Sequence, residues 1–263
     1  MKILRRLPLI GVDSDAALAE ARKLLNRKIE QPARRAFLTH SLTMGGLSLL
    51  TGCSISSNAG VEAALAAISR FNDKVQGRVF DPNQLAPTYP ESMITRPFPF
   101  NAYYGESEVR AIDEASYRLE VTGLVADKRN WALSALRAMP QQDQVTRHIC
   151  VEGWSAIGKW GGVRFADFLK RVGADTSAMF VGFKCADDYY TSIDMPTALH
   201  PQTLLALTYD GEPLPPKYGF PMKLRMPTKL GYKNPKHIQA MFVTNTYTGG
   251  YWEDQGYNWF GGS

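Results

Sequence analysis

One stretch of this sequence decides its fold and chemistry: Arg147-His148-Ile149-Cys150-Val151-Glu152-Gly153-Trp154-Ser155. Polar and apolar side chains alternate along it, which predicts a strand with His148, Cys150 and Glu152 on one face. A soft thiolate between an imidazole and a carboxylate suits a transition metal better than Mg²⁺ or Ca²⁺. The same thiol could instead be a nucleophile or an ordinary buried residue, because free Cys is among the most buried residue types.

The composition indicates a folded globular protein without a surface for nucleic acid. The chain has 263 residues, of which 44% are hydrophobic and 11% aromatic, enough for one large core or two small ones. The first 52 residues hold nine Lys and Arg against four Asp and Glu, so they account for the pI near 9.0. The rest carries 21 basic and 21 acidic residues, and such a neutral body argues against nucleic-acid binding.

The N-terminal 53 residues have the outline of an export leader. Arg34 and Arg35 precede an apolar run, Phe37 to Leu50, that lacks Asp, Glu, Lys and Arg. This pattern is typical of a twin-arginine signal, and the run is shorter than the roughly 20 residues that a membrane crossing needs. An apolar core helix behind two surface arginines is the alternative. We therefore expect export by the twin-arginine route to a periplasmic or other extracytoplasmic location.

The leader ends on Leu50-Thr51-Gly52-Cys53, which resembles a bacterial lipobox. In that motif the Cys becomes the acylated first residue of the mature protein, so Cys53 is the one expected attachment to a membrane. Cys150 and Cys185 would then be the remaining thiols, and in an oxidising compartment they could form a disulfide instead.

The patterning divides the chain into the leader (1–53), a tether with a proline-rich arm (54–100) and a body (101–263). A short helix is expected at 61–71, and five prolines between 81 and 100 predict an extended arm. Strands are expected at 117–125, around Cys150, and at 179–185, 204–209, 222–226 and 238–244, with helices at 131–139, 165–172 and 195–199. The aromatic tail, 247–263, is interpreted as a cap on the core, with a docking surface for a partner as the alternative.

Several familiar chemistries have no motif in this sequence. There is no Gly-x-Gly-x-x-Gly, no Walker loop, no Cys-x-x-Cys-His and no His-Glu-x-x-His. The four histidines are scattered, which argues against a multi-His metal site: His40, His148, His200 and His237.

A second group of motif residues occurs late in the chain and indicates the family. It runs from Gly211-Glu212-Pro213-Leu214-Pro215-Pro216-Lys217-Tyr218-Gly219-Phe220-Pro221 through Met222-Lys223-Leu224-Arg225-Met226-Pro227 to Gly231-Tyr232-Lys233-Asn234-Pro235-Lys236-His237-Ile238. Together with the Cys150 motif, it resembles the molybdopterin-binding domain of the sulfite oxidase superfamily. Within that superfamily the sequence is most similar to the catalytic subunit of periplasmic protein-methionine-sulfoxide reductase. The resemblance covers about 101–246 and implies a β-rich α+β fold, a single domain after the leader.

The resemblance also implies a molybdenum–molybdopterin cofactor, with Cys150 as the protein ligand to the metal. The positions that would bind the cofactor are Asn101, Tyr104, Gly105, Cys185, Tyr218, Lys223, Asn234, Pro235 and Lys236. Lys233 and Lys236 are cations that could face a phosphate. Tyr218, Lys223 and Cys185 depart from the residues that relatives carry, and Arg225 could replace a missing Arg.

By the same resemblance, the reaction is oxygen-atom transfer at the Cys-held molybdenum. Glu152 would order a water or a proton beside the metal. Arg147 could attract an anionic substrate, although strand alternation places it on the opposite face from Cys150. The expected substrate is a sulfoxide or similar small S- or N-oxide, because Val-Glu-Gly-Trp-Ser follows the Cys.

Three alternatives remain open from the sequence. The first is oxidation of the sulfite dehydrogenase type, and the second is a cofactor-free exported binding lipoprotein. The third is a hydrolase using Cys150 and His148, which lacks an evident orienting Asp or Asn. For the enzyme reading, a separate electron-transfer partner is expected, such as a membrane cytochrome b or a cytochrome c.

Overall fold

The computed structural model describes residues 59–263. The chain divides into two compact units, Met1–Ala64 and Leu65–Ser263. The predicted twin-arginine signal and the Cys53 acylation site lie outside the described residues. Within residues 59–263, no helix combines the length and the apolar character needed to cross a membrane.

A helix and an extended arm precede the body. Helix α3, Ala59–Val79, is longer than the helix predicted at 61–71 and continues almost to Pro82. The arm that follows is irregular, as its prolines predict, with one 3₁₀ turn, η1 (Glu91–Met93). A second 3₁₀ turn, η2 (Glu106–Glu108), occurs at the start of the body. The amide of Tyr89 donates to the carbonyl of Val145 at 3.0 Å, so the arm runs along an edge of the body.

The first sheet contains one parallel strand pair. Its order is β2-β1-β10-β5-β6, in which β1 and β10 are parallel and the other neighbours are antiparallel. The strands are β1 (Arg118–Gly123), β2 (Trp131–Ala132), β5 (Phe180–Cys185), β6 (Tyr190–Asp194) and β10 (Ile238–Thr244). The helix expected at 131–139 is therefore wrong at its start, because Trp131 and Ala132 pair with β1 before α4 begins.

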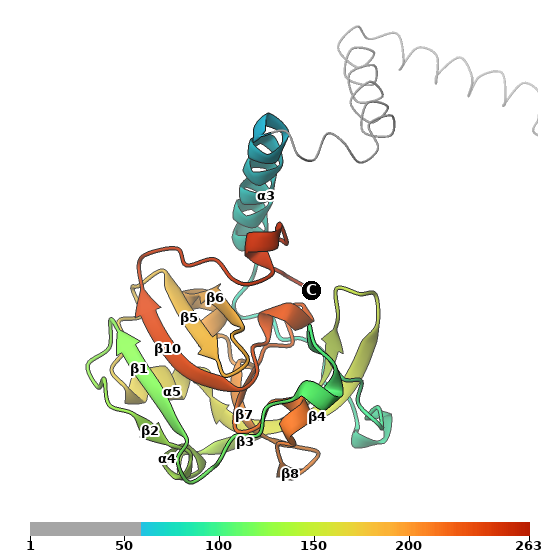
Figure 1. Cartoon of the computed structure of the whole chain (residues 1–263), viewed down its shortest axis with the longest axis vertical. Helices are drawn as coiled ribbons and strands as arrows, with labels where there is room; N and C mark the ends of the chain where they lie inside the picture. Colours follow the sequence, from blue (N-terminus) through green and yellow to red (C-terminus); the bar gives the residue numbers. More distant parts are fainter. Residues whose placement is uncertain (1–58) are drawn as a thin grey trace, which may run out of the picture. The chain divides into compact units, whose positions relative to one another are not determined.

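The second sheet is antiparallel throughout and supplies the hairpin that carries Cys150. Its order is β3-β4-β7-β8, with β9 also paired to β7. The strands are β3 (Gln141–Ile149), β4 (Ser155–Arg164), β7 (Leu204–Tyr209), β8 (Glu212–Pro213) and β9 (Lys223–Arg225). Figure 1 shows β3, β4 and β7 running beneath the first sheet.

Strand β4 and strand β6 were not predicted from the sequence. Three glycines in β4 obscure its pattern, and the structure shows why two of them are there. A Cβ on Gly162 would lie 2.0 Å from the carbonyl oxygen of Leu205, and one on Gly161 would lie 2.2 Å from Asp143 Oδ1. The glycines therefore allow β7 to approach β4 at a register shift between Gly161 and Gly162.

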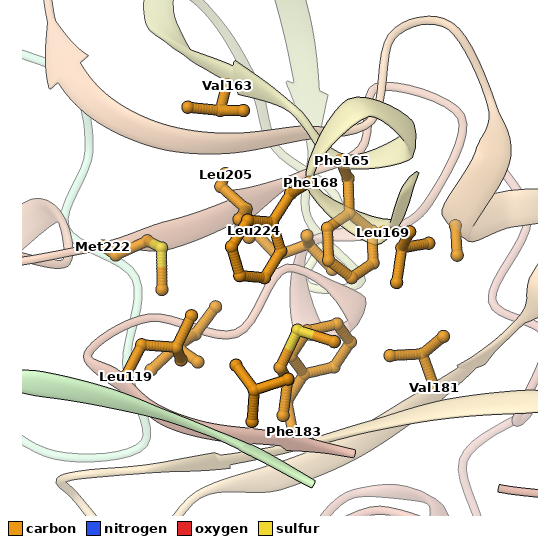
Figure 2. Packing of buried hydrophobic residues seen from close by; sticks show 14 of the residues in the cluster. Leu119, Val163, Phe165, Phe168, Leu169, Val181, Phe183, Leu205, Met222 and Leu224 are labelled. Carbon is orange, nitrogen blue, oxygen red and sulfur yellow. The ribbon is translucent and has the colours of Figure 1, made fainter. Parts of the chain in front are cut away.

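The main core fills the space between the two sheets and helix α5. Helices α4 (Leu133–Arg137), α5 (Phe165–Arg171) and α6 (Met195–Leu199) cover its edges. Figure 2 shows side chains of β4, β7 and β9 facing those of β1 and β5, with Phe165, Phe168 and Leu169 of α5 between them. The expected fold class, a β-rich α+β domain, is confirmed.

Candidate active site

The β3–β4 hairpin presents Cys150 from a turn. Strand β3 ends at Ile149, and the amide of Cys150 donates to the carbonyl of Trp154 at 2.9 Å. Gly153 adopts a φ of 92°, which a side chain would resist, and so closes the reversal into β4. The predicted strand through Cys150 and Glu152 is therefore wrong beyond Ile149, although the turn still holds the two side chains together.

Polar side chains surround the Cys150 sulfur. Asn101 Nδ2 donates to Cys150 Sγ at 3.2 Å, and Glu152 Oε2 lies 3.6 Å from the same sulfur. Trp154 Nε1 donates to Glu152 Oε2 at 2.9 Å and so fixes that carboxylate. Burial raises the pKa of the Cys150 thiol. Cys150 and Cys185 are both free thiols rather than a disulfide pair.

A cavity of about 190 Å³ opens beside this sulfur. Its walls come from segments far apart in the sequence: the arm, the Cys150 turn, the β5–β6 turn, the β9–β10 connection and the C-terminal segment. The residues that line it are Phe100, Asn101, Ala102, Tyr103, Cys150, Val151, Glu152, Asp187, Tyr189, Lys223, Gly231, Tyr232, Asn234, Pro235, Lys236, Trp252 and Tyr257.

Two buried lysines line this cavity, Lys223 and Lys236, and a buried arginine, Arg225, lies beneath them. Lys223, Arg225 and Lys236 are at most 8% exposed. Within residues 59–263, no ion pair joins any of them to a carboxylate. Burial lowers the pKa of Lys236 to about 8 and that of Lys223 well below its usual value. Because unpaired buried charges are costly, the arrangement calls for an anion.

Arg225 and Asn234 organise the loop beneath the two lysines. Arg225 donates to the carbonyl of Arg147 at 2.6 Å and to Asn234 Oδ1 at 3.2 Å. The same Asn234 oxygen accepts from the amide of Met226 at 2.6 Å, and Asn234 Nδ2 donates to the carbonyl of Leu230 at 3.0 Å. The Asn234 side chain is thus committed to holding the β9–β10 connection in shape.

His148 adds an unsatisfied polar group next to the cavity. It is 1% exposed, and neither ring nitrogen has a partner. A Cβ on Gly231, which lines the cavity, would lie 2.7 Å from His148 Nε2. Burial lowers the pKa of His148 well below its usual value, and the charges of Lys223 and Arg225 lower it further, so the ring is neutral.

Residues 106–252 match the family model described as the oxidoreductase molybdopterin binding domain, which is more than half of the chain. The chain belongs to the molybdopterin-binding oxidoreductase family. The resemblance seen in the sequence is thereby confirmed, and the protein is an enzyme of this class.

Relatives of this oxidoreductase extend over different parts of it. A protein of Azospira oryzae, provisionally named protein-methionine-sulfoxide reductase subunit YedZ1, is 72% identical over 97% of both chains. The uncharacterized oxidoreductase YuiH of Bacillus subtilis is 29% identical over 56% of this chain and 74% of its own. The protein-methionine-sulfoxide reductase catalytic subunit MsrP of Xanthomonas axonopodis pv. citri is 36% identical over 39% of this chain and 37% of its own.

The residues of the cavity fit the cofactor that this family implies. Lys223 and Lys236 offer unpaired positive charge to the phosphate of a pterin, and the neutral His148 offers unused nitrogens. Cys150 offers one soft ligand to molybdenum. Within the described residues, no group of three or more His, Cys, Asp or Glu could hold a metal alone, so the pterin would complete the coordination.

Seven of the predicted site residues meet at the cavity: Asn101, Cys150, Glu152, Lys223, Asn234, Pro235 and Lys236. Tyr104 is not a lining residue but packs behind the lining, where Asp187 Oδ2 accepts from its hydroxyl at 2.8 Å and Lys236 Nζ lies 5.6 Å from its ring centre. Gly105 begins η2 and donates its amide to Glu108, away from the cavity lining.

Three other predicted residues do not line the cavity. Cys185 is buried at the end of β5, and the Tyr218 hydroxyl donates to the carbonyl of Phe98 at 2.8 Å inside an aromatic cluster. Arg147 lies on the opposite face of β3 from Cys150, as strand alternation indicates. Its guanidinium stands 5.1 Å over the Tyr89 ring and lines a separate cavity of about 550 Å³.

The sequence analysis missed the aromatic wall of the cavity and one acid. The wall consists of Tyr103, Tyr189, Tyr232, Trp252 and Tyr257, and the acid is Asp187. The density of aromatic residues in the tail was a signal, but it was assigned to capping of the core. Asp187 had no signal, because the tight turn between β5 and β6 brings it to the site.

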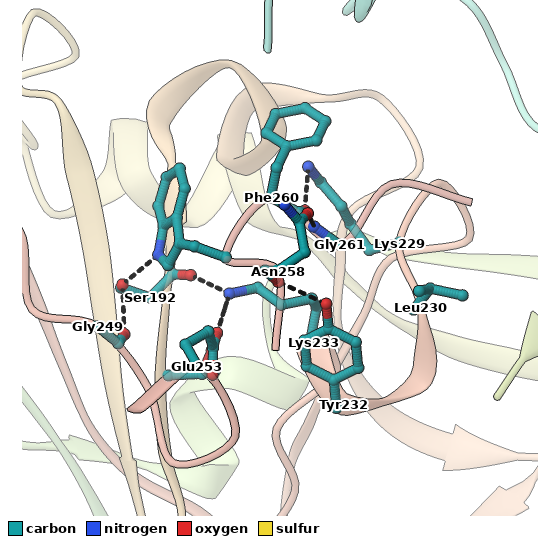
Figure 3. A network of polar contacts seen from close by, with 12 residues as sticks. Ser192, Lys229, Leu230, Tyr232, Lys233, Gly249, Glu253, Asn258, Phe260 and Gly261 are labelled. Carbon is teal, nitrogen blue, oxygen red and sulfur yellow. Dashed lines mark hydrogen bonds and ion pairs between the residues drawn. The ribbon is translucent and has the colours of Figure 1, made fainter. Parts of the chain in front are cut away.

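Lys233 does not serve the cavity. Its ammonium pairs with Glu253 and donates to Thr191 Oγ1 at 3.1 Å and to the carbonyl of Ser192 at 2.7 Å, as Figure 3 shows for Glu253 and Ser192. Both side chains of the ion pair are 1% exposed. Of the two lysines considered for a phosphate, only Lys236 is therefore available.

Proposed function

We propose that this oxidoreductase removes the oxygen atom from a sulfoxide or a similar small S- or N-oxide, with electrons supplied by a separate partner. The observation that carries the proposal is the Cys150 sulfur at the wall of a cavity that also contains unpaired Lys223 and Lys236. The likeness to proteins named as methionine-sulfoxide reductase subunits favours a sulfoxide.

Each part of the cavity has a role in this proposal. Cys150 would hold the molybdenum, which when bound supplies two-electron exchange of an oxygen atom with the substrate. Lys223 and Lys236 would hold the anionic end of the pterin, because neither ammonium forms an ion pair within the described residues. The Asp187 carboxylate on the same wall offsets only part of the burial that lowers the pKa of Lys236. Asn101 Nδ2 would orient the sulfur through the bond that it already donates to Cys150 Sγ.

Glu152 is the candidate for handling protons. Its carboxylate is exposed, lies 3.6 Å from the Cys150 sulfur and is held by Trp154. A group in this position can exchange protons with water and pass one to an oxygen atom that leaves the substrate as water. Protons are consumed when a sulfoxide is reduced to a sulfide, so the reaction requires such a group.

The cavity lining favours reduction of a neutral oxide over oxidation of sulfite. An anionic substrate needs cations that the cofactor does not occupy, and apart from Lys223 and Lys236, which we assign to the pterin, no Lys or Arg lines this cavity. Arg147, the nearest along the sequence, lies on the opposite face of β3. The aromatic wall instead suits the sulfur and methyl groups of a thioether or sulfoxide.

We further propose an extracytoplasmic location, reached by the twin-arginine route, with Cys53 as a lipid attachment point. The paired Arg34 and Arg35 and the lipobox-like ending support this. No haem or flavin motif occurs in the sequence, so the electrons would come from another protein, such as a membrane cytochrome b or a cytochrome c.

Metal analysis of the purified chain tests the proposal. We expect stoichiometric molybdenum after expression in a host that makes the cofactor, and reduction of methionine sulfoxide with a reduced viologen dye as electron donor. Cys150→Ser should lose the activity, whereas Cys185→Ser should keep it, because Cys185 does not line the cavity. A folded chain without molybdenum would favour the binding-protein alternative, and sulfite oxidation without sulfoxide reduction would overturn the direction proposed.

A further inference from the structure

Helix α3 exposes its apolar side chains instead of burying them. A helix on a globular protein normally turns its apolar stripe to the core. In the part of α3 that belongs to the second compact unit, five large apolar residues are between 44% and 75% exposed: Leu65, Ile68, Phe71, Val75 and Val79. At 100° per residue, these positions fall within about a third of the helix circumference.

Two polar side chains outside the stripe, Asp73 and Gln76, fix α3 to the body. Asp73 Oδ1 accepts from Asn258 Nδ2 at 2.6 Å and from the amide of Phe260 at 2.8 Å. One turn later, Gln76 Oε1 accepts from the amide of Gly262 at 3.4 Å. Figure 1 shows the end of α3 beside the C-terminal segment. These bonds set the rotation of the helix and leave the stripe exposed, and its last residue, Val79, also lines a cavity together with Phe260 of the tail.

A row of basic residues winds toward the stripe from the far side of the helix and meets it at Arg78. Arg70, Lys74 and Arg78 follow one another at every fourth position and are exposed. In the described part of the chain, none of them forms an ion pair with an acid. The only acid between Leu65 and Val79 is Asp73, which is already bonded to the tail.

We propose that residues 65–79 of α3 lie on the surface of an anionic phospholipid bilayer. An apolar stripe beside a basic row is the pattern of a helix that lies in the interface, with its apolar side chains among the acyl chains and its cations at the phosphates. In its described residues, the helix is not long and apolar enough to cross a membrane. A second copy of the chain would bring another basic row and no acidic one, so charge complementarity selects the lipid.

This contact would add a second attachment to the lipid expected at Cys53. Cys53 lies shortly before Ala59 in the sequence, where α3 begins. The helix contact needs no acylation, however, and can be measured without it.

Vesicle flotation of the full chain carrying Cys53→Ser tests the proposal, because this variant has no lipid to attach. We expect it to float with phosphatidylglycerol–phosphatidylcholine vesicles more than with phosphatidylcholine alone. Ile68→Ser/Phe71→Ser/Val75→Ser should lower the partition coefficient about tenfold or more, since three apolar side chains leave the interface. Arg70→Gln/Lys74→Gln/Arg78→Gln should lower it on the anionic vesicles and remove its salt dependence.

A matched control changes exposed apolar residues outside α3. Leu124→Ser/Met179→Ser removes side chains that are 42% and 58% exposed, and it should float like the parent. Hydrogen exchange locates the contact: amides of 65–79 should exchange more slowly with anionic vesicles. All changed residues are exposed, so circular dichroism should be unaltered, and the charge variant gives an independent answer if the apolar variant loses helix.

Three results would overturn the proposal. The parent chain could fail to float, or the α3 variants could float as well as the control, which would place the contact in the leader or elsewhere. Vesicles could also leave hydrogen exchange at 65–79 unchanged. A parent that does not float but forms a dimer, with the apolar variant monomeric by light scattering, would assign the stripe to a second copy.

Discussion

Lys223 carries an ammonium group that is 5% exposed and has no acid partner within residues 59–263. Its nearest aromatic contact is Trp160, whose ring centre is 5.1 Å from Nζ. Burial lowers its pKa, and Lys236 and Arg225 lower it further because their charges repel it. Burying an ammonium without an ion-pair partner destabilises the cofactor-free fold. A bound anion would offset this desolvation penalty, which explains why a lysine occupies the position.

Replacing Lys223 should therefore separate stability from cofactor binding. We expect Lys223→Met to raise the free energy of unfolding of the cofactor-free chain by about 1–3 kcal/mol, because a buried unpaired charge is replaced by an apolar side chain of similar length. The same change should lower the molybdenum content of the purified protein. Urea unfolding and metal analysis measure the two effects.

Lys184→Met is the control for this prediction. Lys184 is exposed on β5, so its replacement should change neither stability nor molybdenum content. A Lys223→Met chain that is less stable than the parent without cofactor would show that the ammonium stabilises the fold, and the anion argument would then fail.

At the residue scale, the sequence indicated which residues lie at the cavity better than it indicated their interaction partners. Cys150, Asn101 and Lys236 were placed by family resemblance, and the position of Arg147 away from Cys150 follows from strand alternation alone. The exclusion of Lys233 could not be foreseen. It depends on Glu253, twenty positions later, folding back to neutralise the ammonium.

The C-terminal segment, 247–263, acts as an element although it contains only one 3₁₀ turn, η5 (Glu253–Gln255). Trp252 and Tyr257 form part of the cavity wall, while Trp259 Nε1 donates to Ser192 Oγ at 2.9 Å. The ion pair of Lys233 and Glu253 holds this segment to the β9–β10 connection, as Figure 3 shows. Thr191 Oγ1 of β6 also donates to Glu253 Oε1 at 2.8 Å. The tail therefore does more than the core capping that its sequence suggested, because it also shapes the site.

Breaking this ion pair should destabilise the chain strongly. We expect Glu253→Ala to lower the free energy of unfolding by about 3–5 kcal/mol, since it leaves the Lys233 ammonium buried and unneutralised. Lys233→Met/Glu253→Leu should recover most of the loss, because it removes both charges. Urea unfolding of the parent and these variants measures the effect.

Asp254→Ala is the matched control, because Asp254 is exposed and accepts a hydrogen bond from Tyr190. We expect it to cost about 1 kcal/mol or less. If the double variant is as unstable as Glu253→Ala, the loss comes from the space that Glu253 fills and the electrostatic explanation is wrong.

Helices and strands with a regular hydrophobic period in the sequence were predicted closely. Those whose boundaries depend on packing against other strands were not. The ranges 195–199, 204–209 and 238–244 match α6, β7 and β10. Strand β4 was missed because its glycines are weak strand formers in the sequence. They are required only in the folded sheet, where Leu205 and Asp143 leave no room for a side chain. The strand through Cys150 ended early for a related reason, since β3 has to reverse in order to pair with β4.

On the scale of the whole molecule, the cavity exists only when distant segments meet. Its lining runs from Phe100 in the arm to Tyr257 in the C-terminal segment, and includes the β5–β6 turn of the first sheet and Lys223 of β9 in the second. The sequence motifs could name its chemistry but not its walls, because no local pattern records which turns meet. A site of this kind requires a completed fold before cofactor can be held, which agrees with the proposed export of a folded protein.

The buried lysines should also give the whole cofactor-free chain an unusual pH dependence. Burial lowers the pKa of Lys229 to about 7 and that of Lys236 to about 8, whereas both are near 10.4 in an unfolded chain. Between pH 7 and 8.5 the unfolded chain therefore binds more protons than the folded one, so the free energy of unfolding rises with pH. Below these folded pKa values both states bind the proton, so the free energy of unfolding no longer depends on pH through these two groups.

Lys229→Met isolates one group in this dependence. Lys229 Nζ donates to the carbonyl of Phe260 at 2.9 Å, and its replacement should remove roughly 1–2 kcal/mol of the rise in unfolding free energy between pH 7 and 8.5. Above that window ionising thiols oppose the effect, because burial raises the pKa of Cys185 in the fold. Urea unfolding at the two pH values measures the slope, and an equal slope in parent and variant would show that Lys229 keeps its proton. The loaded enzyme should have a shallower slope than the cofactor-free chain, since a phosphate beside Lys236 would keep that ammonium charged throughout.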